Sequence, residues 1–146
     1  MRRGTWLAAP VIAIAVLACG DSFQPQDFEL ATGARVQIRV PAGPFTPGAV
    51  VPISVRNQGG DTYIWNPCYR SLQQRVAGRW LPVDEGERVC TDEAWILVSG
   101  DRTDAETDLA PSLEAGEYRF LYQFRRELGA RSVGRYQVSN SFLVGR

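Results

Sequence analysis

The chain has 146 residues, 45% of them hydrophobic, which suits one globular domain and argues against disorder over the whole length. Its 16 basic residues, all arginine, balance 16 acidic residues, so the composition gives no sign of a nucleic-acid-binding surface. Histidine is absent, which removes the usual general base, the commonest zinc ligand and every Ser-His-Asp or Cys-His arrangement.

The first eighteen residues have the pattern of a secretory signal peptide. Met1-Arg2-Arg3 is a positively charged start, and an apolar run extends from Leu7 to Ala18. This run is shorter than the roughly 20 apolar residues that a transmembrane helix needs. We therefore expect a cleaved signal peptide at residues 1–18, a tether at residues 19–33 and one exported domain at residues 34–146.

The end of the signal peptide resembles the lipobox of bacterial lipoproteins, with Val16-Leu17-Ala18 before Cys19. The resemblance implies diacylglyceryl transfer to the Cys19 sulfur, cleavage before that residue and acylation of the new amino group. Two or more acyl chains would hold the protein on a bilayer. Gly20, in place of aspartate, would permit outer-membrane delivery in bacteria that sort lipoproteins this way. The alternatives are an ordinary signal peptide in which Cys19 is incidental and an uncleaved anchor.

The other two cysteines, Cys68 and Cys90, form an even pair in an oxidising compartment once Cys19 carries lipid. A disulfide between them would close a loop of roughly 23 residues and contribute on the order of 3 kcal/mol in the chain-entropy model. A metal pair is the alternative, but two cysteines without histidine make a poor zinc site. We favour the disulfide and expect no metal and no other cofactor.

Alternation of apolar and polar residues predicts β-strands along the rest of the chain, and no helical stripe follows the signal peptide. Pro52 indicates that its strand lies at an edge or begins there, because proline has no N–H for a ladder. The expected fold class is all-β, an antiparallel sandwich of seven to eight strands. Segments that read as strands are 28–30, 36–40, 51–55, 62–65, 72–76, 80–83, 94–98, 102–109, 118–124 and 136–144.

The segment Leu113-Glu114-Ala115-Gly116-Glu117-Tyr118 is similar to the turn before strand F of immunoglobulin-like domains. The resemblance implies an immunoglobulin-like sandwich over residues 34–145, in which Tyr118 closes a tyrosine corner. Antibody domains bridge strands B and F, but Cys68 and Cys90 lie elsewhere, so the chain resembles the immunoglobulin-like modules of exported bacterial proteins. A weaker similarity is to the intracellular proteinase inhibitor family of bacilli, from which no reactive loop carries over.

Aromatic residues are plentiful in the middle third of the chain. If exposed, they could stack on sugar rings or anchor a protein interface, and if buried they fill the space between two sheets. We expect core packing for most of them and retain four as possible binding residues: Tyr63, Trp65, Trp80 and Trp95.

Charged side chains gather in three places: acids at Asp101, Asp104, Glu106 and Asp108; acids around Cys90 at Asp84, Glu85, Glu87, Asp92 and Glu93; and arginines at Arg125, Arg126, Arg131 and Arg135. The first group could bind calcium, but it lacks the Asp-x-Asp-x-Asp-Gly phrase, so a solvated face that protects an edge strand is favoured. The second could hydrolyse glycosidic bonds, but so small a domain leaves little room for a cleft. The third could contact anionic lipid or an acidic partner, although a solvated loop is favoured.

These patterns predict a non-catalytic binding or accessory module on the periplasmic or surface face of the cell envelope. Its expected partners are the membrane, through lipid on Cys19, and an envelope protein. No catalytic residue and no nucleic-acid partner are expected. A carbohydrate-binding domain and a sandwich-type proteinase inhibitor are the alternative functions.

Overall fold

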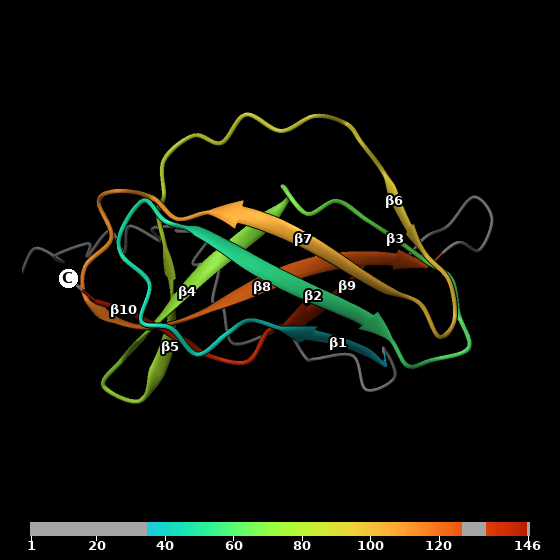
Figure 1. Ribbon diagram of the computed structural model, residues 1–146, viewed down its shortest axis with the longest axis horizontal. Coiled ribbons are helices and arrows are strands. Elements are labelled where there is room, and N and C mark those ends of the chain that lie inside the picture. Colours follow the sequence, from blue (N-terminus) through green and yellow to red (C-terminus); the bar gives the residue numbers. More distant parts are fainter. Residues whose placement is uncertain (1–34, 127–133, 146) are drawn as a thin grey trace, which may run out of the picture.

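The computed structural model describes residues 35–126 and 134–145, which form ten β-strands and, within those ranges, no helix. The strands build two antiparallel sheets that pack face to face (Figure 1), so the prediction of an all-β sandwich is confirmed. The predicted strand at 28–30 lies outside the described residues. The strands are β1 (Val36–Arg39), β2 (Val50–Asn57), β3 (Tyr63–Trp65), β4 (Arg70–Val76), β5 (Arg79–Val83), β6 (Trp95–Leu97), β7 (Arg102–Asp108), β8 (Gly116–Arg126), β9 (Gly134–Val138) and β10 (Phe142–Val144).

The smaller sheet, sheet A, has the order β1-β2-β7. Val51, Ile53 and Val55 of β2 point into the core and are at most 2% exposed, while the residues between them face outward. Burial of a side chain of this size contributes about 1.5–3 kcal/mol, and only the period of two places all three on one face. The alternation predicted from the sequence is therefore confirmed for this strand.

The position of Pro52 differs from the prediction, because β2 is the central strand of sheet A and not an edge. Pro52 lies opposite Glu106 of β7. On the other side, β1 pairs only with residues 54–57 of β2, so no described strand flanks the proline there. β2 is flanked by strands on both sides only over residues 54–56, and it has a free edge at Pro52, where the missing N–H does not cost a ladder hydrogen bond.

The larger sheet, sheet B, contains two rows of paired segments on one side of β8. β3 and β4 follow one another along the same edge of β8, with Ile64 opposite Arg125 and Arg70 opposite Tyr122. β6 pairs with β3, and β5 pairs with β4, so the next row is also divided in two. We call β3 and β4, which pair with β8, the inner row, and β6 and β5, which pair with them, the outer row. Residues 66–69 interrupt the inner row and residues 84–94 interrupt the outer row, at the same position along β8.

The predicted final strand at 136–144 is divided into β9 and β10, which pair with β8 on its other edge. Of two polar residues between them, Ser139 still bonds to β8 and Asn140 bonds to another part of the chain. Ser139 Oγ accepts a hydrogen bond from the Phe120 N–H at 3.0 Å. The Asn140 amide spans the Val40 backbone, since Oδ1 accepts from its N–H and Nδ2 donates to its carbonyl, both at 2.8 Å. The side-chain bonds of Asn140 to Val40 interrupt the pairing with β8 after Ser139, and this division adds one strand to the count.

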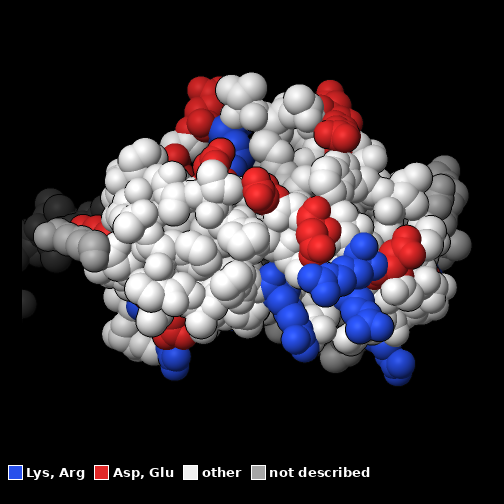
Figure 2. Space-filling model, in the orientation of Figure 1, with Lys and Arg blue, Asp and Glu red and all other residues white. Residues whose placement is uncertain are grey.

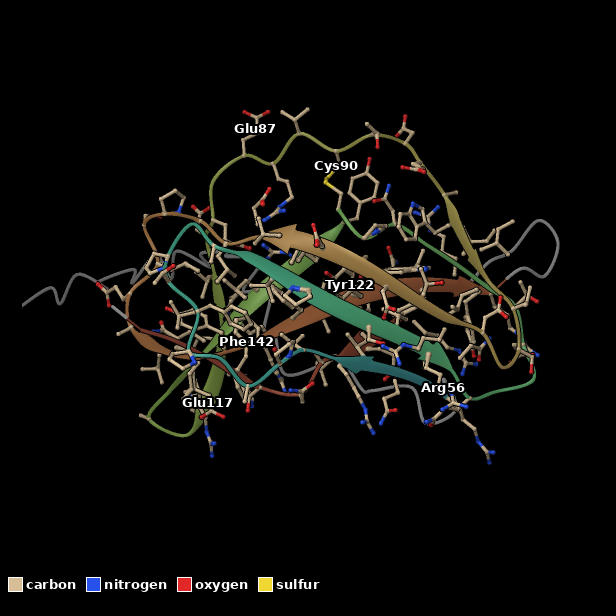
Figure 3. The ribbon with its side chains drawn as sticks, in the orientation of Figure 1. Arg56, Glu87, Cys90, Glu117, Tyr122 and Phe142 are labelled. Carbon is tan, nitrogen blue, oxygen red and sulfur yellow. A yellow bond between two sulfur atoms is a disulfide. The ribbon has the colours of Figure 1, made fainter. Side chains whose placement is uncertain are left out.

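Aromatic rings fill the core of the sandwich, among them Tyr122 and Phe142, which are labelled in Figure 3. Phe120 and Phe142 have ring centroids 4.8 Å apart, and Trp65 stacks on Phe124 at 5.6 Å. Such pairs add about 0.5–1.5 kcal/mol to the burial of the rings themselves. The core is therefore built largely from β8 and the strands beside it.

Tyr118 is buried at the start of β8, and its hydroxyl donates a hydrogen bond to the carbonyl of Glu114 at 2.8 Å. A bond from this tyrosine to backbone a few residues upstream defines the tyrosine corner of immunoglobulin-like sandwiches. The contact that the resemblance implied is present at the expected residue.

Candidate binding site

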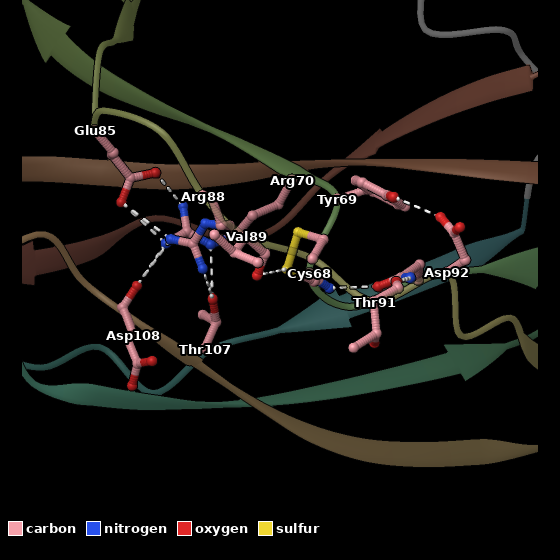
Figure 4. Close-up of a disulfide and its surroundings, with 12 residues drawn as sticks. Cys68, Tyr69, Arg70, Glu85, Arg88, Val89, Thr91, Asp92, Thr107 and Asp108 are labelled. Atoms are coloured by element: carbon pink, nitrogen blue, oxygen red, sulfur yellow. Dashed lines mark hydrogen bonds and ion pairs between the residues drawn. A yellow bond between two sulfur atoms is a disulfide. The ribbon is translucent and has the colours of Figure 1, made fainter.

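The two interruptions in sheet B are joined by a disulfide between Cys68 and Cys90, whose Cα atoms are 5.6 Å apart. Cys68 lies in the break between β3 and β4, and Cys90 lies in the long connection between β5 and β6 (Figure 4). The predicted disulfide is confirmed. It fixes the long connection, residues 84–94, against the inner row of the sheet.

Asn66 shapes the inner break and attaches it to the long connection. Its Oδ1 accepts a hydrogen bond from the Cys68 N–H at 2.8 Å, a local turn that asparagine forms readily. Its Nδ2 donates to the carbonyl of Thr91 at 2.8 Å. One amide side chain therefore holds both interruptions together beside the disulfide.

On the inner side of the break, Arg70 is a fully buried charge, with its side chain 0% exposed. Its guanidinium makes a two-pronged ion pair with Glu85 of the long connection (Figure 4). It also donates to Thr107 Oγ1 at 2.7 Å and to the Asp108 carbonyl at 2.6 Å, both on β7, and it lies 4.5 Å from the centre of the Phe120 ring. Arg70 thus joins sheet B, the long connection and sheet A.

Arg88 brings a second guanidinium to the same place. It donates to Thr107 Oγ1 at 3.3 Å and to the Asp108 carbonyl at 3.1 Å, and it lies 3.6 Å from Glu85. Burial, together with the charge of Arg70, lowers the pKa of Arg88. Both guanidinium groups contact Glu85, Thr107 and the Asp108 carbonyl, so we assign the cluster a structural role in holding the long connection over one side of the sandwich.

On the outer side of the break, a depression of 480 Å³ opens on the solvent face of sheet B. Its volume lies within the range of roughly 300–1,000 Å³ that is usual for ligand pockets. Tyr69 is its most exposed aromatic residue, at 53%, and donates a hydrogen bond to Asp92 at 3.1 Å. This bond and the charge of Asp92 raise the pKa of Tyr69. The pocket is lined by Ile64, Trp65, Asn66, Tyr69, Asp92, Glu93, Ala94, Gln123 and Arg125.

The four aromatic residues predicted as possible binding residues are not brought together in this pocket. Trp65 lines the pocket but is only 3% exposed, and Tyr63 is 1% exposed, so both rings pack mainly in the core. Trp95 is half-buried and packs against Trp65 at 5.8 Å. Trp80 lies on β5, covered on one face by the Arg119 guanidinium at 4.4 Å.

Tyr69 belongs to the same group of aromatic residues in the middle third of the chain but is not among the four retained as possible binding residues. Its neighbours give the signal, since Pro67 and Cys68 interrupt the strand immediately before it. A residue in a break does not follow the alternation of the strands, so the periodicity could not say whether its ring faces the core.

The acidic residues separate into different environments. Asp104, Glu106 and Asp108 are exposed on the outer face of β7, as the alternation predicted. Within residues 35–126 and 134–145, no group of three or more His, Cys, Asp or Glu side chains is placed to hold a metal ion. Of the acids around Cys90, Glu85 pairs with Arg70, Asp92 and Glu93 line the pocket, and Asp84 and Glu87 are exposed.

The arginines of the late hairpin also have different environments. Arg125 lines the pocket, and Arg126 forms an ion pair with Asp61. Arg135 is half-buried on β9. Arg131 lies outside the described residues.

The predicted signal peptide, the tether and the lipidated Cys19 also lie outside the described residues. In the described part of the chain, no helix has the length and apolar character needed to cross a membrane.

Two stacked antiparallel sheets, a tyrosine corner at the start of β8 and an aromatic core define an immunoglobulin-like β-sandwich. Residues 32–143 match the family described as the bacterial Ig-like domain, and the chain belongs to that family. No curated protein sequence matches the chain.

Proposed function

We propose that this protein is a non-catalytic binding module, held on the periplasmic or surface face of an envelope membrane by lipid on Cys19, which recognises a protein partner through the pocket at the strand break. The observation that carries the proposal is the exposed ring of Tyr69. It is fixed by a hydrogen bond to Asp92 above a depression of 480 Å³, while most other aromatic rings are in the core.

The apolar surface beside the pocket favours a protein as the binding partner. Ile64 and Ile96 lie opposite one another on the outer face of β3 and β6, and Ile96 is 59% exposed. Val98, just after β6, is 43% exposed. Apolar side chains next to an exposed tyrosine and a polar rim are typical of the centre of a protein interface. The family match favours an accessory or binding role over catalysis.

The anchoring part of the proposal rests on the sequence before the domain. An apolar run of signal-peptide length ends at Cys19, with small and aliphatic residues in front of it. Mass spectrometry of the native protein should show a chain that begins at Cys19 and carries acyl groups. An unmodified Cys19 would contradict the anchor but would leave the pocket untested.

The binding part is tested by photo-crosslinking in the native cell. A photoreactive residue at position 96, beside the pocket, should capture a defined partner, and the same probe at exposed Leu143 on β10 should not. Tyr69→Ala should abolish capture at position 96 without changing the amount of folded protein. Equal capture at both positions, or capture that survives Tyr69→Ala, would refute the pocket as the recognition site.

A second candidate, carbohydrate binding, is favoured by the planar polar groups around Tyr69. Asn66, Gln123 and Arg125 surround an exposed ring, a combination that can hydrogen-bond and stack on a sugar. Titration with envelope polysaccharides should then change the tryptophan fluorescence, because Trp65 and Trp95 are in contact beside the pocket. No change on titration would exclude this alternative.

A further inference from the structure

The solvent face of sheet A carries four exposed arginines at one end: Arg35, Arg39, Arg56 and Arg102. Arg56 lies directly opposite Arg102 in the pairing of β2 and β7, and Arg39 lies opposite Ser54 in the next row. Figure 2 shows basic side chains gathered over this end of the sheet, and Figure 3 labels Arg56 among them. We call these four residues the arginine patch.

The charges of the patch are only partly neutralised. Arg102 pairs with Asp104 at 3.1 Å, and Asp101 is the residue immediately before Arg102. Arg39 and Arg56 form no ion pair with the described residues. Like charges directly opposite one another on neighbouring strands destabilise a sheet. An external anion would relieve this repulsion.

The patch also contains a depression. Arg39 and Arg102 stand on either side of a groove of 510 Å³, and Pro52 and Ser54 lie on the strand between them. Asp104, which pairs with Arg102, also lines the groove. The side chains of Pro52 and Ser54 are short, so they leave room between the flanking guanidinium groups. Guanidinium groups present several donors in a plane, a geometry that matches phosphate oxygens.

The remaining acids of this face lie further along β7, away from the patch. Glu106 lies opposite Pro52, and Asp108 lies opposite Val50. The face is therefore basic at one end and acidic at the other. A negatively charged surface would attract the basic end and repel the acidic end.

The domain begins at the basic end. The Arg35 carbonyl accepts a hydrogen bond from the Gln58 N–H at 2.6 Å, which places the start of the domain beside the end of β2. Residues 20–34 separate Cys19 from this point. Sixteen steps of extended chain reach at most about 55 Å. A lipid on Cys19 would keep the patch within that distance of the bilayer.

We propose that the arginine patch binds the headgroups of anionic phospholipids in the membrane that anchors the protein. The orientation of the domain relative to the membrane rests on the proposed lipid anchor, whereas the charge of the patch does not. Sheet A then faces the bilayer. The pocket at the strand break lies on the outer face of sheet B and is turned away from the membrane, where a partner can reach it.

The test uses the mature lipidated chain in vesicles of phosphatidylcholine, with or without phosphatidylglycerol. A solvent-sensitive fluorophore is attached to Gln37→Cys, opposite Arg56 on β1, or to Leu143→Cys on the other sheet. We expect a blue shift at position 37 only on vesicles that contain phosphatidylglycerol, and its loss at high salt. Position 143 should report water on both kinds of vesicle.

Arg39→Gln with Arg56→Gln should abolish the shift at position 37. The matched control is Arg75→Gln with Arg79→Gln, which removes the same charge from the exposed β4–β5 hairpin and should leave the shift intact. Three results would overturn the proposal: a blue shift at position 37 that does not depend on phosphatidylglycerol, a blue shift at position 143, or equal loss of the shift in the two double substitutions.

Failure of the anchor is recognised separately, by mass spectrometry of residue 19. In that case, sedimentation of the unlipidated chain with the same vesicles tests the patch alone. Loss of Arg39 and Arg56 should weaken binding to phosphatidylglycerol vesicles about 30-fold, because each arginine near an anionic surface contributes about 1 kcal/mol of binding free energy. Binding that is unchanged by the double substitution would refute the patch even without a lipid anchor.

Discussion

The guanidinium of Arg70 is buried among groups from three parts of the chain. Glu85 comes from the long connection, Thr107 and the Asp108 carbonyl from β7, and the Phe120 ring from β8. A charge removed from water needs both a counter-charge and full hydrogen bonding. Arg70 has both, which makes Glu85 the residue on which the arrangement depends.

Glu85→Gln should lower the free energy of unfolding by about 3 kcal/mol, because loss of one partner leaves a buried charge uncompensated. Arg88, 3.6 Å from the same carboxylate, would add repulsion. The measurement is equilibrium unfolding in urea. Asp104→Asn, which breaks the exposed pair with Arg102, is the control and should cost less than about 1 kcal/mol. Similar losses in the two variants would contradict this account.

Two buried tyrosines of β8 provide a matched pair of substitutions. Tyr118→Phe removes the hydroxyl that bonds to Glu114 and should cost about 1 kcal/mol of stability. The Tyr122 hydroxyl is buried and has no hydrogen-bond partner among the described residues, so Tyr122→Phe should cost nothing or stabilise the fold. Urea unfolding of both variants checks the difference, and a larger loss for Tyr122→Phe would be inconsistent with it.

The same burial predicts a dependence on alkaline pH. Burial raises the pKa of Tyr122 above its ordinary value of 10. A pKa that is raised on folding gives stability below the unfolded pKa and loses it as the pH rises toward the folded pKa. We expect the free energy of unfolding to fall above about pH 10, by up to about 1.4 kcal/mol per pH unit for this group. Tyr122→Phe should fall less steeply in the same titration.

At the scale of elements, the matching breaks in two neighbouring rows create the site. The inner row turns at Asn66, and the outer row leaves the sheet for residues 84–94 before it returns as β6. The inner face of the break is filled by the ion-paired arginines, and the outer face is left open as the pocket. The disulfide joins the two breaks and fixes their separation.

Cys68→Ser with Cys90→Ser should lower the free energy of unfolding by about 3 kcal/mol, since the bond closes a loop with a sequence separation of 22 residues. Amide exchange should accelerate in residues 84–94 and remain slow in the central part of β2. Hydrogen-exchange mass spectrometry separates the two regions. Uniform acceleration, or none in residues 84–94, would contradict a local role for the disulfide.

Turns were predictable where local chemistry decides them. The sequence predicts a hairpin at residues 77–79, and the structure has one between β4 and β5. Ala77 and Gly78 have φ values of 49° and 80°, the left-handed pair that a two-residue hairpin requires. The break at residues 139–141 was not predictable, because Asn140 bonds to Val40, a hundred residues away.

At the scale of the whole molecule, the two proposed surfaces are on opposite faces of the sandwich. The arginine patch is on the outer face of sheet A, and the pocket is on the outer face of sheet B. Because the core separates them, substitutions on one face should not disturb the other.

Capture of a partner by the crosslinker at position 96 should therefore survive Arg39→Gln with Arg56→Gln. The fluorophore shift at position 37 should likewise survive Tyr69→Ala. Each variant is measured in the assay of the opposite face. Loss of both signals in a single variant would mean that the two surfaces are coupled or that the variant is misfolded, which circular dichroism distinguishes.

Much of the fold could be predicted from the sequence alone. Period-two alternation places Val51, Ile53 and Val55 on one face, and Tyr118 and its turn mark the corner of the sandwich. An even cysteine pair indicated the disulfide. These features depend on neighbours along the chain or on simple counting, so they need no knowledge of the packing.

The tertiary structure alone decided which aromatic residues are exposed and which charges are paired. Trp65 and Tyr69 are four residues apart, yet one is in the core and the other on the rim of the pocket, because a break separates them. Glu85 meets Arg70 only because two rows of sheet B are interrupted at the same level. Such contacts join residues that are distant along the chain, and their burial is set by the packing of both sheets and not by local periodicity.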